Sequence, residues 1–399
     1  MALVQARPQA DHVHQVWSGR PRLSTASKVI SAETVRLNAI CPYFTMFPLD
    51  FPLGILKAHA RRDARVLDPF CGRGTTNFAA RLLGLRTIGI DASRVATAAT
   101  QAKLVAPTPG EIIDAAKTIL RRRRNCIEIP EGEFWNLAYH SDVLRDLCLI
   151  RDALLKGSIS SHVAAALRGI ILGALHGPVG RTKHSYFSNQ CPRTYGPKPA
   201  YAVKFWKKRG LLPPRVDVLA VVAERAQRYY GDASPKVVGA AIEGDSRQRS
   251  TLDEAREVIG KFDWIVTSPP YYGLRTYLPD QWIRNWFLGG PASVDYTSEG
   301  QLSHSGRDRF VADLREVWEN AGAHCRPGAT LVIRFGSIGD RLVEDPAQLI
   351  SASLEATGWV RTDVQHANNA AKGKRQADTF HRTRSDPCEE VDVWARWQP

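Results

Sequence analysis

Closely spaced cysteine pairs are missing from this chain of 399 residues. None of its seven cysteines forms a Cys-x-x-Cys motif, so neither a zinc ribbon nor a disulfide framework is expected. The 24 prolines and 30 glycines are too few for a collagen-like or low-complexity chain. The first residues lack the apolar core of a secretion signal, and no run is apolar for long enough to cross a bilayer. These absences predict a cytoplasmic globular protein with no metal and no membrane contact.

A surplus of basic residues is the main feature of the composition. There are 54 Lys and Arg against 40 Asp and Glu, which gives a net charge of +14. Such a surplus favours a polyanionic partner, and nucleic acid is the first expectation. The alternative is a basic globular protein without such a partner. The length and the 44% of hydrophobic residues suit one large domain with an insertion, or two domains.

The hydrophobic pattern divides the chain into four parts. Residues 1–40 are polar and predict an arm with little regular structure, and residues 41–93 predict a helix after Pro52 and then a strand–turn–helix–strand unit. Residues 94–235 show helical periodicity without strands, which indicates a helical insertion. From 236 to 399 strands and helices alternate again, which is typical of an α/β domain. The predicted helices of the last two parts are 94–104, 111–124, 136–156, 160–175, 215–230, 279–288, 307–323 and 346–356. The predicted strands there are 237–242, 263–267, 329–335, 358–364 and 390–396.

A glycine-rich turn with a spaced acid is the first motif with a chemical meaning. Residues 68–74, Asp-Pro-Phe-Cys-Gly-Arg-Gly, follow the predicted strand 64–67 and precede a helix. Glycine at 72 and 74 lets a ligand approach the backbone, and the helix start offers free N–H groups. Asp91 ends the next strand 19 residues after Gly72, where an acid can accept hydrogen bonds from two ribose hydroxyls.

The same turn differs from the known phosphate-binding loops. Thr75, Thr76 and Asn77 follow Gly74, so the third glycine of a Gly-x-Gly-x-x-Gly motif is missing, and no Lys follows Gly74 as it would in a Walker loop. A nucleoside-type cofactor without a phosphate cradle is therefore favoured. The alternative is an ordinary tight turn.

The second motif is Ser268-Pro269-Pro270-Tyr271, at the end of the predicted strand 263–267. Prolines fix the backbone and cannot donate, so the carbonyl oxygens are held in place as acceptors. A serine oxygen and a proline carbonyl together make a two-acceptor fork for an NH2 group, and a tyrosine ring can stack on a planar base. The alternative is a turn that only ends the strand.

These motifs resemble those of the S-adenosylmethionine-dependent amino DNA methyltransferases, which methylate cytosine N4 or adenine N6. DPFCGRGTT resembles their cofactor loop, TIGIDAS the acidic motif, EGDSRQ the adenine-edge motif and CPYFTMFPLDFP the segment at the methionine end. TSPPYYGLRTY resembles the catalytic motif in its Ser-Pro-Pro-Tyr form, which the family uses mostly for cytosine N4. The resemblance covers 41–93 and 237–397. It implies a Rossmann-like class I methyltransferase fold, with a mostly parallel seven-stranded sheet and a helical insertion.

The order of the motifs departs from the commonest layout of Ser-Pro-Pro-Tyr enzymes. In those enzymes the catalytic motif usually comes first, whereas here the cofactor turn comes about 200 residues earlier. The fold can be the same in a permuted chain. The departure leaves adenine N6 open as the target beside cytosine N4.

The resemblance assigns roles residue by residue. Ser268 and the Pro269 carbonyl would hold the target amino group, Pro270 would keep the turn rigid, and Tyr271 would stack on a base flipped out of the duplex. The implied cofactor residues are Phe44, Asp68, Phe70, Gly72, Gly74, Thr75, Asp91 and Asp245. Asp68 either fixes its turn or meets the methionine amino group. Asp245 either accepts from the adenine or caps the segment after it. Phe47 and Tyr272 are further aromatic candidates, with local packing as their alternative.

The helical insertion 94–235 is the predicted target-recognition region, and a basic and aromatic stretch inside it is the candidate for reading DNA. Residues 181–209 hold eight Lys or Arg and six aromatic residues but no acid. Basic side chains suit phosphates, and Arg also suits base edges. The candidate contacts are Arg181, Lys183, Arg193 and Lys198, with Lys374 and Arg375 in a second basic run. A solvated basic surface over a local aromatic core is the alternative.

The sequence therefore predicts a site-specific DNA cytosine-N4 methyltransferase that uses S-adenosylmethionine. We expect it to act as a monomer on double-stranded DNA in a restriction–modification system, with a possible cognate restriction endonuclease. The alternatives are adenine-N6 methylation, guanine-N2 methylation of RNA, and a silent DNA-binding relative.

Overall fold

Seven strands form one sheet, and their pairing brings the two motifs together. The computed structural model describes residues 34–41, 47–122, 127–177, 185–190, 198–232, 235–272, 278–294, 302, 306–336, 345–367 and 390–399. The strands are β1 (Arg65–Asp68), β2 (Arg86–Asp91), β3 (Gly239–Glu243), β4 (Phe262–Thr267), β5 (Cys325–Gly336), β6 (Trp359–Ala367) and β7 (Glu390–Trp397). They lie in the order β3-β2-β1-β4-β5-β7-β6, and β7 runs antiparallel to both of its neighbours. The predicted α/β fold with a mostly parallel seven-stranded sheet is confirmed.

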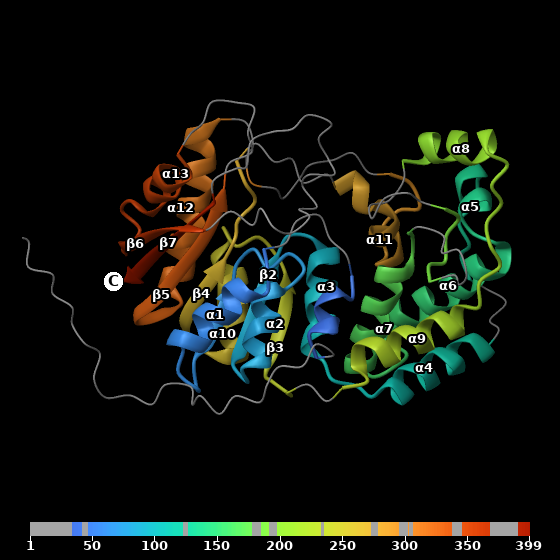
Figure 1. Cartoon of the computed structure of the whole chain (residues 1–399), viewed down its shortest axis with the longest axis horizontal. Coiled ribbons are helices and arrows are strands. Elements are labelled where there is room, and N and C mark those ends of the chain that lie inside the picture. The colour runs from blue at the N-terminus through green and yellow to red at the C-terminus, as the bar shows by residue number, and fades with distance from the viewer. Residues whose placement is uncertain are drawn as a thin grey trace, which may run out of the picture.

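Helices cover both faces of this sheet (Figure 1). One face carries α1 (Asp50–His59), α2 (Thr75–Leu82) and α3 (Arg94–Leu104), and the other carries α10 (Arg249–Ile259), α12 (Arg307–Ala323) and α13 (Pro346–Leu354). The alternation of strand side chains explains the two layers. In β1, Val66 packs with the cluster under α1 and α2, while Leu67 packs with the cluster under α10 and α12.

A separate group of helices stands beside the sheet, at the right of Figure 1. It consists of α4 (Pro109–Arg121), α5 (Glu133–Ala138), α6 (Ser141–Leu155), α7 (Ser161–Ala174), α8 (Pro199–Lys208), α9 (Val218–Tyr230) and α11 (Trp282–Phe287), with short 3-10 helices at Thr34–Ala39 and Leu278–Gln281. We call these elements the helical unit. Its own apolar core includes a packed group of indoles from Trp135, Trp282 and Trp286. Among the described residues, no helix is long and apolar enough to span a membrane.

Helix α3 joins the helical unit to the sheet. It packs against β2, β3 and α7, and Ala99 and Ala102 lie in the core of the helical unit. The Tyr230 hydroxyl donates to the Ala102 carbonyl at 2.7 Å, and the Lys103 ammonium donates to the Asn38 side chain at 2.7 Å. The C-terminal end of α3 is therefore held by the helical unit, although the sequence pattern groups the whole of α3 with the insertion.

Several predicted elements differ from the observed ones. The prediction of a polar arm with little regular structure is wrong for residues 34–40, because Thr34–Ala39 form a 3-10 helix and Leu37 and Ile40 are buried in the helical unit. Residues 1–33 lie outside the described residues. The single helix predicted over 136–156 is two helices, since Tyr139 is extended and its hydroxyl donates to the Leu175 carbonyl. Helices α8 and α10 were not predicted.

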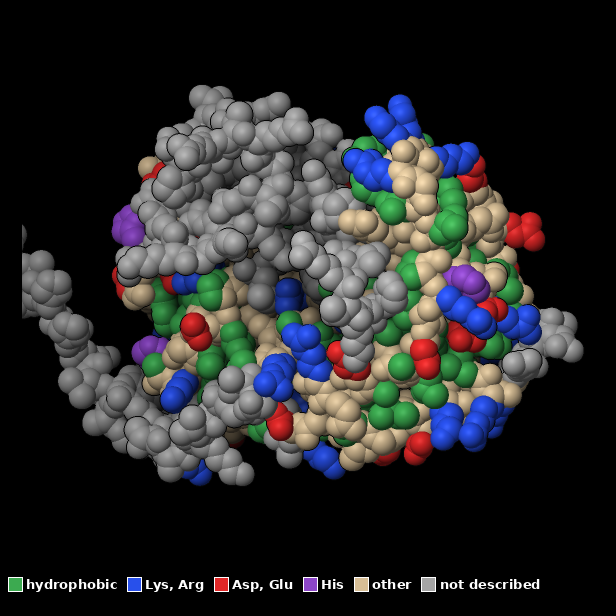
Figure 2. Space-filling view, turned by 45° about the vertical axis from the view of Figure 1, so that its right-hand side comes forward, with side chains coloured by type: hydrophobic (Ala, Val, Ile, Leu, Met, Phe, Trp, Pro, Cys, Tyr) green, Lys and Arg blue, Asp and Glu red, His purple; other side chains and the backbone are tan. Residues whose placement is uncertain are grey.

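Basic side chains form separate groups on the described surface, and one group lies over α8 at the upper right of Figure 2. This helix contains Lys204, Lys207 and Lys208, and Arg209 follows it. All four side chains are exposed.

We expect Gly173→Ala to lower the free energy of unfolding by about 3 kcal/mol, because overpacking a fixed backbone contact is costly. A Cβ at Gly173 in α7 would overlap the carbonyl oxygen of Ile40, which is part of the chain and cannot rotate away. Urea denaturation of both proteins measures the difference. Gly54→Ala in α1 is the matched control, because a Cβ there meets nothing within 4 Å. The control should gain about 0.5–1 kcal/mol from helix propensity. Equal stability of Gly173→Ala and the wild type would contradict the close packing of α7 on residues 34–41.

Candidate active site

The two sequence motifs start from neighbouring strand ends. Leu67 in β1 pairs with Ile265 in β4, so the glycine-rich turn and the Ser-Pro-Pro-Tyr segment leave the same edge of the sheet. Thr267, the last residue of β4, donates its hydroxyl to Asp68 Oδ1 at 2.6 Å. This hydrogen bond joins residues that are 199 positions apart in the sequence.

The glycine-rich turn needs glycine at both predicted positions. Gly72 has φ +51° and Gly74 has φ +74°, a region that other residues rarely adopt. A Cβ at Gly74 would lie 2.6 Å from the Thr100 hydroxyl, so α3 packs directly against the turn. Among the described residues, the nearest atom to a Cβ at Gly72 would be the Phe70 carbonyl oxygen, at 4.0 Å. The space beside Gly72 is therefore open to a ligand.

Asp91 ends β2 and holds the turn. Its carboxylate accepts the backbone N–H of Gly72 at 2.9 Å and that of Ser93 at 2.9 Å. Burial raises the pKa of Asp91 to about 6, although these two hydrogen bonds favour the charged form. Each carboxylate oxygen keeps a lone pair for a further donor such as a ribose hydroxyl.

Asp68 ends β1 and is fully buried. Its Oδ1 accepts from the Thr267 hydroxyl and from the Phe70 N–H at 3.2 Å, so the residue fixes its own turn. No described residue donates a hydrogen bond to its Oδ2. Burial raises the pKa of Asp68 to about 7, against the hydrogen bonds that lower it. An unpartnered buried carboxylate oxygen suits an ammonium group.

These two carboxyl groups predict a pH dependence of cofactor binding. Only the ionised forms accept donors on both oxygens, so affinity for S-adenosylmethionine should rise with pH and level off above about pH 7, the pKa of Asp68. Below about pH 6 each unit of pH should cost about tenfold in affinity per titrating group. Both folded-state pKa values exceed the unfolded value, so their contribution to stability falls as pH rises from about 4 to 7 and is then constant. Isothermal titration without DNA between pH 5 and 8 measures the affinity, and a flat profile would contradict the prediction.

Asp245 lies two residues after β3 and is engaged within the protein. It accepts from the backbone N–H of Arg247 at 2.9 Å and from the Arg247 guanidinium at 2.6 Å, and Arg247 also pairs with Asp313 at 3.3 Å. Burial opposes ionisation, but the hydrogen bonds from Arg247 outweigh it and leave the pKa of Asp245 below its usual range. These contacts favour the alternative in which Asp245 orders the segment before α10. A role toward adenine stays a prediction.

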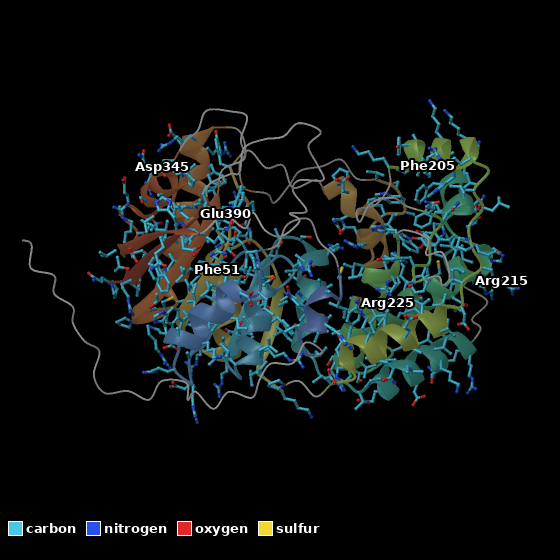
Figure 3. The ribbon with its side chains drawn as sticks, in the orientation of Figure 1. Phe51, Phe205, Arg215, Arg225, Asp345 and Glu390 are labelled. Atoms are coloured by element: carbon cyan, nitrogen blue, oxygen red, sulfur yellow. The ribbon has the colours of Figure 1, made fainter. Side chains whose placement is uncertain are left out.

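The remaining predicted cofactor residues lie around the same turn. Phe70 is half-buried and its ring edge meets Trp318 of α12, with 6.0 Å between ring centroids. Thr75 is buried at the first position of α2. Phe47 packs on Phe51, labelled in Figure 3, and contributes to the core under α1. Phe44 lies outside the described residues.

The Ser-Pro-Pro-Tyr segment leaves β4 as a non-helical turn. Ser268, Pro270 and Tyr271 are half-buried, and Pro269 is buried. The Tyr271 hydroxyl donates to Glu390 Oε1 at 3.1 Å, and its ring meets Phe335 with 5.4 Å between centroids. Glu390, labelled in Figure 3, begins β7. Tyr271 is thus held at the ends of β5 and β7. Tyr272 packs on Phe310 of α12, as its alternative predicted.

Sequence reasoning missed the residues that support the site from a distance. Thr267 could have been found, because it directly precedes the motif. Ser246, whose hydroxyl donates to the Pro69 carbonyl at 2.8 Å, also follows a predicted site residue directly. Arg247 and Glu390 carry no comparable signal. The partner of Arg247 becomes visible only in three dimensions, and Glu390 follows Tyr271 by 119 residues.

The predicted DNA contacts are mostly outside the described residues, namely Arg181, Lys183, Arg193, Lys374 and Arg375. Lys198 is described and lies exposed at the start of α8. Within the described part of the chain no group of three or more His, Cys, Asp or Glu could hold a metal ion.

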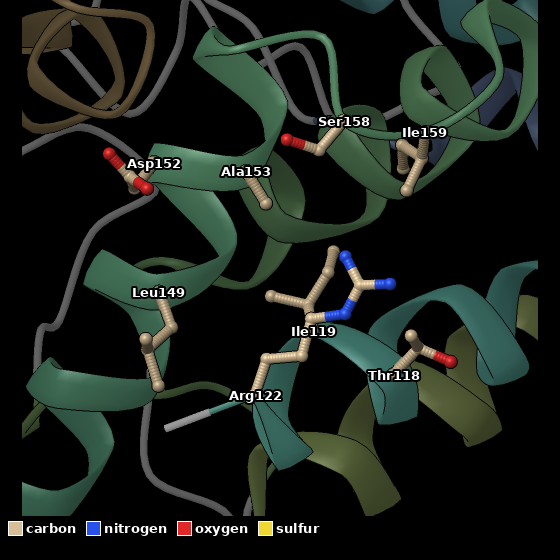
Figure 4. A pocket seen from close by; sticks show the side chains of 8 residues that line it. All are labelled: Thr118, Ile119, Arg122, Leu149, Asp152, Ala153, Ser158 and Ile159. Carbon is tan, nitrogen blue, oxygen red and sulfur yellow. The ribbon is translucent and has the colours of Figure 1, made fainter. Parts of the chain in front are cut away.

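A small pocket lies elsewhere, in the helical unit (Figure 4). It has a volume of about 70 Å³ and is lined by residues of α4, of α6 and of the loop after α6, among them Arg122, Asp152 and Ser158. This volume holds only a few water molecules. The pocket is therefore too small for a nucleoside.

Comparisons with solved structures return distant methyltransferases. An rRNA methyltransferase, aviRa, from Streptomyces viridochromogenes is 11% identical with a TM-score of 0.33, and the match covers 91% of this chain and 92% of that chain. TehB from Haemophilus influenzae is 9% identical with a TM-score of 0.30, covering 89% of this chain and 64% of that one. Phosphoethanolamine N-methyltransferase 2 from Haemonchus contortus is 9% identical with a TM-score of 0.33, covering 93% and 58%. Scores this low carry no weight for the function. No curated protein matches the chain.

One protein-family model matches, and it covers the cofactor turn. It is the N6/N4 methyltransferase model, described as DNA methylase, and it matches residues 3–102. The residues there fit S-adenosylmethionine, the methyl donor of such enzymes. Asp91 offers acceptors at the end of β2, Gly72 leaves open space, and no described residue donates to Asp68 Oδ2. Residues 3–102 are thus similar to the N6- and N4-directed DNA methylases that this model describes.

Proposed function

We propose that the protein methylates the exocyclic N4 amino group of cytosine in DNA. One observation carries the proposal. The hydrogen bond from Thr267 to Asp68 places Ser268 directly beside the turn that carries the cofactor residues. A target amino group held at Ser268 would therefore lie near the methyl donor.

The chain's contribution to the reaction is to position and activate a poor nucleophile. The lone pair of an exocyclic amino group is delocalised into the ring, and two acceptors, the Ser268 oxygen and the Pro269 carbonyl, would draw both N–H bonds out of the ring plane. S-adenosylmethionine, when bound, supplies an electrophilic methyl group. Because positioning and electrostatics account for the rate, no covalent intermediate with the protein is needed.

The target base must leave the duplex to reach this edge of the sheet. Tyr271 would then stack on it. The hydrogen bond to Glu390 and the contact with Phe335 fix the plane of the tyrosine ring before DNA arrives. A ring that is already fixed loses little freedom on binding.

We propose that the helical unit reads the DNA sequence, with Lys198 among its contacts. The unit lies beside the carboxyl edge of the sheet, and its basic surface suits a polyanion (Figure 2). We also propose that the protein acts as a monomer, which can methylate each strand separately. Its proposed role is restriction–modification in the cytoplasm, together with a cognate endonuclease.

Adenine N6 is the second candidate target. The order of the two motifs leaves it open, because the cofactor turn precedes the catalytic turn, unlike the commonest Ser-Pro-Pro-Tyr layout. The same two acceptors can hold either amino group.

Nucleoside analysis separates these targets. The purified protein is incubated with S-adenosylmethionine and unmethylated DNA, and with RNA in parallel, and the products are digested for mass spectrometry. We expect N4-methylcytosine in DNA only. Detection of N6-methyladenine would change the proposed target base to adenine but leave the proposed active site unchanged. Methylation of RNA alone would refute the proposal.

A further inference from the structure

Helix α8 has one inward face and one outward face of different composition. Ala202 and Trp206 are buried in the core of the helical unit, where the Trp206 indole lies 5.6 Å from the Phe134 ring of α5. The outward face carries side chains at the spacing i, i+3, i+4, i+7 and i+8, which lie on one side of a helix. They are Tyr201, Lys204, Phe205, Lys208 and Arg209.

Three of these outward side chains form a stack. The Arg209 guanidinium lies 4.0 Å from the centre of the Phe205 ring, within the range of a cation–π contact. The Phe205 ring in turn stacks with Tyr201 at 6.4 Å and an interplanar angle of 27°. Tyr201 is 68% exposed, so the outer end of the stack is open to the surroundings of the protein.

The charge of this face is uncompensated. No Asp or Glu occurs between residues 198 and 215. Lys207, on the flank of the helix, pairs with Glu133, and Arg215 pairs with Asp142. By contrast, Lys204, Lys208 and Arg209 make no ion pair with any described residue.

The position of α8 suits a large ligand at the active site. The antiparallel β7 runs toward the C-terminus, marked at the left of Figure 1, and the parallel strands run the opposite way, with their carboxyl ends toward the upper side. Helix α8 lies at the top of the helical unit on that same side, with Phe205 labelled in Figure 3. A duplex that crosses the carboxyl edge can therefore extend to α8.

We propose that the outward face of α8 binds the phosphate backbone of the DNA that flanks the target base. The inference rests on the proposed DNA methyltransferase function and adds a defined contact surface to it. Lys204 and Lys208, one turn apart, meet phosphates as point charges. Arg209 presents its planar fork, and the ring of Phe205 holds that fork in place before DNA binds.

The test uses the full-length protein and a short fluorescein-labelled DNA duplex, with binding followed by anisotropy. Lys204→Glu/Lys208→Glu should weaken binding at least about tenfold and reduce the slope of log affinity against log salt by about 2, since each phosphate contact contributes about 0.9. Lys57→Glu/Lys117→Glu is the control, because it makes the same change in charge on exposed parts of α1 and α4. An equal loss in both double variants would overturn the proposal, because only net charge would then matter.

A second variant tests the stack without changing any charge. Phe205→Leu keeps an apolar side chain but removes the ring under Arg209, and should weaken binding by about threefold. Circular dichroism confirms that each variant is folded. If the wild type methylates DNA while Lys204→Glu/Lys208→Glu and Phe205→Leu both bind like it, the α8 surface is refuted and the proposed function stands. If the wild type does not methylate DNA, the proposed function itself fails.

Discussion

Replacing Ser268 by alanine is expected to lower kcat about 100-fold and to leave the affinity for S-adenosylmethionine unchanged. The variant removes one of the two acceptors for the target amino group, and loss of a single well-placed hydrogen-bonding group in an active site costs 10²–10³ in rate. Asp68 and Thr267 remain bonded to one another in the variant, so the cofactor turn keeps its place. Single-turnover methylation with tritiated cofactor measures the effect on chemistry separately from product release.

The conservative variant Ser268→Thr distinguishes an acceptor role from a structural one. Threonine keeps the oxygen, so it should recover part of the lost rate, whereas a residue needed only for its size would not be rescued by a larger side chain. The wild type and both variants should bind the cofactor equally in isothermal titration. A rate for Ser268→Ala within about threefold of the wild type would exclude Ser268 from holding the target.

The sequence predicts the sheet well because strand signals are local. Residues 65–68 and 262–267 each alternate between the two cores, and a turn follows each of them. Parallel strands share one edge at their carboxyl ends, so the two motifs could be placed together without knowledge of the full strand order. The structure adds the direct bond between Asp68 and Thr267.

Contacts between distant residues could not be predicted in the same way. Nothing near Tyr271 indicates that Glu390 accepts its hydroxyl, because β7 reaches that position only through the order of the sheet. Arg247 was likewise missed as the partner of Asp245, although it lies two residues away, since a basic residue after an acid is common on surfaces. The spacing of a sequence motif indicates which ligand a carboxylate could bind. The hydrogen bonds that the carboxylate makes within the protein decide how many of its lone pairs remain for that ligand.

Helix α8 shows why a basic stretch is hard to interpret from sequence. Gly and Pro residues before it favour a loop, and the helix is fixed by burial of Ala202 and Trp206 in a core contributed by other segments. Once the helix exists, its period sorts the same residues into an inward apolar face and an outward basic face. The net charge of the stretch can be counted from the sequence. Which basic side chains lie on the outward face is known only once the helix is known.

We expect Asp91→Asn to weaken binding of S-adenosylmethionine about 100-fold, with kcat close to the wild type at saturating cofactor. The carboxylate accepts the N–H groups of Gly72 and Ser93 on different oxygens, and an amide can replace only one of these acceptors. The NH2 group of the substituted amide would face either a backbone N–H or the proposed position of the ribose, and it could accept a hydrogen bond from neither. Hydrogen bonds to charged acceptors are worth about 1.5–3 kcal/mol each, so the loss corresponds to one or two of them.

Glu243→Gln provides the matched control for this variant. Glu243 ends β3 and pairs in register with Asp91, but its side chain is 49% exposed and forms an ion pair with Arg94 at 3.3 Å. The Glu243→Gln variant makes the same acid-to-amide change at a neighbouring strand end. It should leave the affinity for the cofactor within about twofold of the wild type. Isothermal titration at pH 6 and pH 8 gives a second readout. The pH dependence of cofactor affinity that Asp91 contributes, with its pKa of about 6, should vanish in Asp91→Asn and persist in Glu243→Gln. If Asp91→Asn bound the cofactor as tightly as Glu243→Gln at pH 8, Asp91 would serve only to hold the turn, and the ribose would have to be bound elsewhere.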